Sequence, residues 1–290
     1  MSTLHVRRVG RTGAALVAAS VVFHLPVSVT PAMGQELTWS GSFDVATGDY
    51  FFDESTTSIY LQNGLGLQWD QFSIDISLPL VLQNNAVVTR VGGMPIPTGG
   101  DQRGDLRGRG GPTSLIELES ASSYEFTVAD PLISAGFDID AGDRLLRTVH
   151  LGLSAKPPIS DVDSGVGTGE WDFGASAGAL LAAGRLLILF DATYWSFGDL
   201  PDLELKDAVA YGAAVGSAIG KSRFGWSMSL LGSTEIIEGI DPPVSLGGSL
   251  YLTSVSRRNL SLGLRFGLTE SAADVSVSVG WGVPLLNTIR

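Results

Sequence analysis

The sequence predicts an all-β protein: a transmembrane antiparallel up-and-down β-barrel of about twelve strands, preceded by a signal peptide. Apolar residues alternate with small or polar ones over runs of about nine residues, the length that crosses a bilayer at a tilt. Short and long connections alternate between these runs. The mean hydropathy is high, +0.25, yet beyond the N-terminus no uncharged apolar run is long enough for a membrane-spanning helix.

The alternation is clearest between residues 223 and 283, in four consecutive runs: Phe224–Leu230, Val244–Leu252, Leu260–Leu268 and Val275–Val283. Successive side chains of a strand point to opposite faces, so each run has one apolar face and one small or polar face. Strands of soluble sandwiches also alternate, but they average about five or six residues. The length of these runs therefore favours a membrane barrel.

The first 34 residues are typical of a secretory signal peptide. Three arginines near the start precede a mostly apolar stretch at residues 14–29, and small residues at 32–34 suit a signal peptidase. An uncleaved anchor is the alternative, but the apolar stretch is short and Pro26 interrupts it. We therefore expect residues 1–34 to be removed and residues 35–290 to form the barrel.

Connections between the expected strands are sorted by length. The strands start near Leu37, Ser58, Phe72, Leu132, Leu145, Trp171, Leu186, Ala208, Phe224, Val244, Leu260 and Val275. Turns near residues 70–71, 141–143, 183–185, 220–221 and 257–259 are short, and the connections between them are mostly longer and rich in Gly, Pro, Asp and Ser. Short periplasmic turns, long external loops and an even number of strands are the pattern of outer-membrane barrels.

Aromatic residues gather near the ends of the expected strands. Such residues form girdles at the two membrane interfaces of a barrel, although aromatic residues also favour strands in general. The candidates for a girdle are Trp39, Trp69, Phe72, Trp171, Phe173, Tyr194, Phe224, Trp226 and Trp281.

Residues 83–131 form one exceptionally long loop, which carries Arg90, Arg103, Arg107 and Arg109. A loop of this length is usually functional or disordered. Since the expected lumen is acidic, a basic loop has a surface on which to dock. We expect it to fold over the external opening as a partial gate; mobile external chain is the alternative.

Composition excludes several classes of function. With a net charge of −12, the chain is not expected to bind nucleic acid. His150 is the single histidine after residue 34, which excludes a metal site built on histidines, and no cofactor is expected. A lipid hydrolase needs a Ser–His pair that faces the lipid, whereas the even number of His150 places it on the lumen face. The chain is therefore not expected to be an enzyme.

The same parity predicts which polar residues line the lumen. They either form a track for a solute with some tolerance for cations, or a hydrated network that braces a narrow barrel. Lys156 and Lys206 are expected as additional partners for the acidic residues. The expected lining comprises Asp44, Asp75, Asp138, His150, Asp172, Asp191, Tyr251 and Arg265, with Arg265 opposite Tyr251.

Two stretches resemble a bacterial outer-membrane family named for the MetA-pathway of phenol degradation. The first is a loop-to-strand passage with Lys156–Pro158 followed by Gly165–Gly174, the second is Gly267–Asp274, and the likeness extends over about residues 130–286. The resemblance implies an outer-membrane barrel that passes small, often aromatic, compounds and has no catalytic residues. The chain departs from the usual ending of outer-membrane barrels, because Val283–Arg290 has no terminal aromatic residue.

These observations together lead us to expect a channel or transporter in the bacterial outer membrane for small, aromatic or hydrophobic solutes. Its expected partners are outer-membrane lipids, the solute and the outer-membrane assembly machinery. The alternatives are a structural or adhesive barrel with a plugged lumen and, less favoured, an outer-membrane lipid hydrolase.

Overall fold

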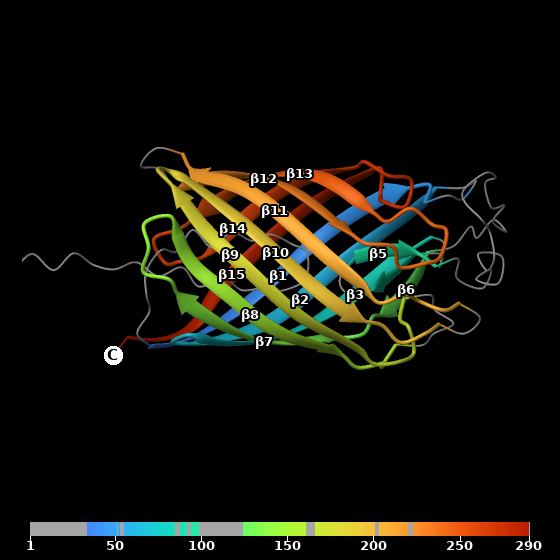
Figure 1. Ribbon diagram of the computed structural model, residues 1–290, viewed down its shortest axis with the longest axis horizontal. Coiled ribbons are helices and arrows are strands. Elements are labelled where there is room, and N and C mark those ends of the chain that lie inside the picture. Colours follow the sequence, from blue (N-terminus) through green and yellow to red (C-terminus); the bar gives the residue numbers. More distant parts are fainter. Residues whose placement is uncertain are drawn as a thin grey trace, which may run out of the picture.

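The computed structural model describes residues 34–50, 52, 55–84, 88–91, 94–98, 124–160, 166–200, 203–219 and 223–289. They form a closed antiparallel β-barrel with strongly tilted strands (Figure 1). Its sheet contains 13 strands, and all but the short β6 form the ring, which closes where β1 pairs with β15 and β2 pairs with β3. The predicted fold class is confirmed. No helix among the described residues is both long and apolar enough to cross a membrane.

The twelve ring strands begin where the alternation predicts. They are β1 (Gly34–Gly48), β2 (Thr56–Trp69), β3 (Phe72–Gln83), β7 (Leu132–Asp140), β8 (Leu146–Lys156), β9 (Asp172–Ala183), β10 (Leu186–Ser196), β11 (Ala208–Ala218), β12 (Phe224–Ser233), β13 (Val244–Thr253), β14 (Asn259–Gly267) and β15 (Val275–Ile289). Three short strands belong to the connection between β3 and β7: β4 (Val88–Val91), β5 (Met94–Pro97) and β6 (Glu125–Val128).

The connections are sorted between the two ends of the barrel. At one end, which we call the short-turn end, tight turns join β2 to β3 and β9 to β10. The opposite end carries β5, β6 and the longer connections, and we call it the long-loop end (Figure 1). In outer-membrane barrels the short turns are periplasmic and the long loops are external.

One predicted register is wrong. Arg265 lies opposite Gly247, and Tyr251 lies opposite Ser261. The cause is a wider turn than expected at residues 254–258, where the Ser254 N–H donates to the Arg258 carbonyl oxygen at 2.8 Å and Arg257 adopts a φ of 61°. The partner of Tyr251 moves by four residues, from 265 to 261, and an even shift leaves the facing of every side chain unchanged.

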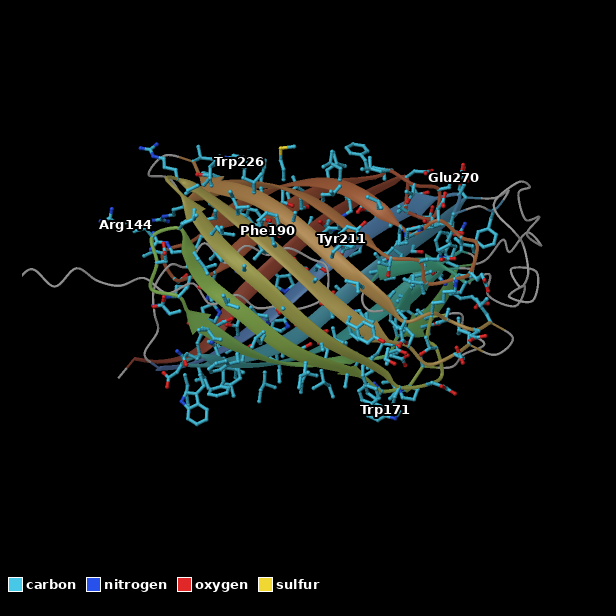
Figure 2. The ribbon with its side chains drawn as sticks, viewed as in Figure 1. Arg144, Trp171, Phe190, Tyr211, Trp226 and Glu270 are labelled. Carbon is cyan, nitrogen blue, oxygen red and sulfur yellow. The ribbon has the colours of Figure 1, made fainter. Side chains whose placement is uncertain are left out.

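An apolar belt covers the outer face of the barrel. The large exposed apolar side chains come from alternate positions of the strands, such as Leu260, Leu262, Leu264 and Phe266 on β14. Figure 2 shows side chains projecting outward along the wall, with Phe190 and Tyr211 among them. An exposed apolar surface of this extent needs lipid rather than water around it.

Aromatic pairs lie toward both edges of this belt. Trp171 and Phe173 are stacked with 5.8 Å between ring centroids at the long-loop end, where Figure 2 places Trp171. Phe72 and Phe137 lie 4.9 Å apart beside the β2–β3 turn at the short-turn end. Positions of this kind suit the interfacial girdles expected from the sequence.

A glycine in β1 allows one aromatic residue to lie flat on the wall. A Cβ at Gly41 would be 2.5 Å from Cζ2 of Trp281 and 2.7 Å from the Gln62 carbonyl oxygen. Gly41→Ala is therefore expected to cost about 1–3 kcal/mol, because the indole ring or the strand must move. Gly248→Ala on β13 is the matched control, since a Cβ there meets nothing closer than 3.8 Å. Urea titration of the protein folded in lipid vesicles measures both; equal stability of the two variants would contradict the argument.

Candidate functional site

The structure places all eight predicted lumen residues on the inward face of the barrel. Asp44, Asp138, His150, Asp172 and Tyr251 are buried, while their neighbours on the outward face are more exposed. Asp75, Asp191 and Arg265 are half-buried on the same inward parity. Their role in lining a solute path stays a prediction.

Acidic residues and one imidazole gather in the middle of the lumen. His150 Nδ1 on β8 lies 2.7 Å from Asp138 Oδ1 on β7. Gly178 of β9 pairs with both His150 and Asp191, so the Asp191 carboxylate belongs to the same stretch of wall, two strands from His150. Asp75 on β3 lines the same cavity as His150. This part of the wall therefore combines several acceptors with a single imidazole.

The opposite wall is lined by small hydroxyl-bearing residues. Ser227 Oγ and Tyr251 Oη are 2.9 Å apart across β12 and β13. On β1, Ser42 Oγ donates to Asp44 Oδ2 at 2.6 Å. Serine and glycine keep this side of the interior polar while occupying little of its width.

A buried ion-pair network fixes the long-loop end. Lys156 Nζ, at the end of β8, lies 3.1 Å from Asp130 Oδ2 and 2.8 Å from Asp172 Oδ2, and all three residues are buried. It also donates to Thr168 Oγ1 at 3.4 Å. Lys156 and Asp172 point inward, as their parity predicts, but no pattern in the sequence indicated Asp130 or Thr168 as their partners.

The same carboxylates hold two other connections. Asp130 Oδ1 accepts hydrogen bonds from the backbone N–H groups of Ile159 and Ser160 at 2.8 and 2.7 Å. Asp172 Oδ1 accepts one from the Gly198 N–H at 3.0 Å. The network therefore ties together the β3–β7, β8–β9 and β10–β11 connections. We call Asp130, Lys156, Thr168 and Asp172 the loop anchor.

Lys206 does not reach the lumen, and that prediction is wrong. It precedes β11 in a connection, where its ammonium group lies 3.4 Å from Glu235 Oε1 with both side chains well exposed. Alternation ends with the strand, so parity carries no information there. Hydrogen bonds also order these connections: the Gly239 N–H lowers the pKa of Glu235, and the Tyr194 hydroxyl lowers the pKa of Asp207.

An apolar cluster spans the opening at the long-loop end. It draws residues from the connections around the barrel and from the β4–β5 hairpin of the long loop. We call it the mouth cluster; it comprises Tyr50, Phe52, Val88, Ile96, Trp195, Phe197, Leu200, Leu203, Leu205, Ala208, Ala210, Ile236 and Ile237. Val88 and Ile96 are 0% and 2% exposed, so the hairpin packs closely against the other residues of the mouth cluster.

The described part of the long loop thus contacts the other connections of the long-loop end through apolar side chains. Docking of the basic loop on the acidic lumen through the four expected gate arginines stays a prediction. Arg103, Arg107 and Arg109 lie outside the described residues, and of Arg90 in β4 only the backbone is described. The expected signal peptide also lies outside the described residues, except for Gly34, where β1 begins.

The short-turn end has a different lining. Leu180, Leu189 and Ala214 form a buried apolar cluster on the inward face of β9–β11, with Leu187 packed against it. Across the barrel, Arg257 of the β13–β14 turn reaches Glu36 of β1, with 3.1 Å between Nη1 and Oε2. The interior is therefore apolar on one side of this end and ion-paired on the other.

The sequence matches no known family profile and no curated protein. Similar solved structures exist nonetheless. An outer membrane channel from Pseudomonas putida F1 has a TM-score of 0.64 at 11% identity, covering 87% of this chain and 96% of the other. The NanC porin has a TM-score of 0.50 at 9% identity, covering 86% of this chain and 100% of the other. At these identities the likeness concerns the fold, which is that of an outer-membrane β-barrel.

The closed ring, the apolar belt and this likeness all bear on the cellular location of the protein. A barrel with a lipid-facing outer surface and a polar interior is the architecture of bacterial outer-membrane proteins. The predicted location in the bacterial outer membrane is thereby confirmed.

Proposed function

We propose that the protein is an outer-membrane channel for small organic solutes. The observation that carries this proposal is the contrast between the two faces of one closed wall. The outer face is an apolar belt, whereas the inner face carries carboxylates, serines and glycines from most of the strands. A polar interior within a closed barrel is the feature that lets barrels conduct solutes.

Aromatic or weakly polar compounds are the solutes that suit the opening. A solute that arrives from the long-loop end meets the mouth cluster, which contributes Tyr50, Phe52, Trp195 and Phe197 among its apolar side chains. Apolar and aromatic linings with a few polar groups are typical of small-molecule sites. The β4–β5 hairpin restricts entry, because it contributes the buried side chains of Val88 and Ile96 to this cluster.

Conductance in planar lipid bilayers tests the proposal. The wild-type protein is expected to give discrete single-channel currents, and Ile96→Asp is expected to enlarge them. A carboxylate in the mouth cluster is desolvated without a partner, so the hairpin is displaced from the opening. Val255→Asp is the control, because that side chain is 76% exposed in the turn at the other end. Heat-modifiable migration in gels shows that each variant still forms the barrel.

A barrel with a blocked lumen is the second candidate, and the mouth cluster favours it. Thirteen buried residues from four connections and from strands β10 and β11 would also suit a permanent plug. Absence of current from both the wild type and Ile96→Asp, with both barrels folded, would support this candidate and contradict the channel.

A further inference from the structure

The short-turn end of the barrel carries a row of exposed arginines. The turns that join β7 to β8, β9 to β10, β11 to β12 and β13 to β14 follow one another around this end, and Figure 2 shows Arg144 there. Because neighbouring strands lie about 4.8 Å apart, successive turns are about 10 Å apart along the rim. We call the exposed arginines of these turns and of the first residues of β8 the arginine arc; they are Arg144, Arg147, Arg185, Arg223 and Arg258.

The charge of the arginine arc is not neutralised within the described part of the chain, where none of its five side chains forms an ion pair. Nearby carboxylates are occupied otherwise. Asp140 and Asp143 each accept a hydrogen bond from a backbone N–H of their own turn, at 2.9 and 2.8 Å. Glu36 pairs with Arg257 at 3.1 Å, and Asp70 belongs to the β2–β3 turn, outside the arc. The arc therefore has positive charge to offer to a partner outside the chain.

The arginine arc lies along the edge of the apolar belt. A large exposed apolar side chain directly follows three of its arginines: Leu145, Leu186 and Phe224. Arg147 is an extra residue at the start of β8, since the pairing with β9 passes from Leu146 to Thr148 without it, and such bulges re-aim a side chain. A long basic side chain beside lipid-facing residues extends toward the lipid head groups. The guanidinium groups therefore lie at the depth of the head groups.

The long-loop end has the opposite charge. Lys206 is the exposed basic side chain of its described connections, and Figure 2 shows Glu270 at this end. The net charge of −12 therefore does not exclude a basic surface at the other end of the barrel. The exposed carboxylates described here are those of Asp49, Glu170, Asp199, Glu204, Asp207, Glu238, Asp241, Glu270 and Asp274.

We propose that the arginine arc is a binding surface for anionic phospholipids, such as phosphatidylglycerol, in the periplasmic leaflet of the membrane. Short turns of outer-membrane barrels are periplasmic. A guanidinium group binds a phosphate through two parallel N–H donors, and the net negative charge of phosphatidylglycerol adds an attraction that zwitterionic phosphatidylcholine lacks. A soluble anionic partner is less favoured, because it gains nothing from arginines placed beside lipid-facing residues. The inference goes beyond the proposed function, since lipid binding requires no conduction.

Electron spin resonance of spin-labelled lipids, with the barrel in phosphatidylcholine vesicles, tests this preference. The wild type is expected to bind labelled phosphatidylglycerol about two- to threefold more strongly than labelled phosphatidylcholine. One arginine near an anionic head group strengthens binding roughly fivefold, and the lipid sites without an arginine lower the average. Sodium chloride at about 1 M is expected to reduce the preference, because it screens the charges.

Variants locate the preference at the short-turn end. Replacing all five arginines of the arc by glutamine is expected to bring the ratio to about one; if that variant fails to show heat-modifiable migration, Arg223→Gln with Arg258→Gln replaces it and is expected to lower the ratio. Arg223→Glu and Lys206→Glu make the same change of charge at opposite ends, and only Arg223→Glu is expected to lower the ratio. Equal effects of this matched pair would overturn the proposal. Equal binding of both lipids by the wild type would also overturn it, and would favour a soluble anionic partner for the arc.

Discussion

Replacing Lys156 by methionine is expected to destabilise the barrel by about 3–5 kcal/mol, because removal of one partner leaves buried charges uncompensated. Lys156 is the only cation within reach of Asp130 and Asp172 among the described ion pairs, and both carboxylates are almost fully buried. Methionine keeps most of the side-chain volume, so the loss comes from charge rather than from a cavity. Urea titration in lipid vesicles measures the free energy of unfolding.

Two comparisons isolate this effect. Lys206→Met removes an exposed lysine from its pair with Glu235 and is expected to cause no measurable loss. Adding Asp130→Asn and Asp172→Asn to Lys156→Met removes the uncompensated charges, and this triple variant is expected to be more stable than Lys156→Met alone. If Lys156→Met is as stable as Lys206→Met, the loop anchor does not hold the long-loop end together.

The strands and their facing could be predicted because alternation is a local property. On β14, residues 260, 262, 264 and 266 are exposed and the residues between them are not, as their sequence indicates. Register is less secure, because it depends on how a turn closes. The turn at residues 254–258 shifted Tyr251 from Arg265 to Ser261 without changing its face.

The long-loop end could not be predicted in the same way, because its contacts join segments far apart in the sequence. Asp130 lies in the connection before β7 and Lys156 is the last residue of β8, and no periodicity relates them. A signal for the mouth cluster was nevertheless present. Leu200, Leu203 and Leu205 occur in one expected loop and Ile236–Ile237 in another, and apolar residues in polar loops indicate burial. The facing of His150 was predictable, but the close packing of its ring over Gly136 and Gly152 was not.

Leu264→Arg is expected to destabilise the folded barrel by about 2–4 kcal/mol, the cost of an arginine on the lipid face near the bilayer midplane. Leu264 is 44% exposed on the outer face of β14, between Gly248 of β13 and Val277 of β15. The guanidinium group of the introduced arginine must either enter the hydrocarbon or draw water and lipid head groups toward it, and both are unfavourable.

Depth provides the matched control for this prediction. Leu268 has the same outward parity but lies just beyond the end of β14, and its side chain is 57% exposed. Leu268→Arg is expected to cost about 0–1 kcal/mol, since the penalty falls toward the interface. Leu264→Ala separates lost contacts from the charge. The free energy of unfolding in phosphatidylcholine vesicles measures all three variants. Equal costs for arginine at 264 and 268 would mean that β14 does not cross the hydrocarbon with Leu264 near its centre, and the lumen assignment of Arg265 would fail with it.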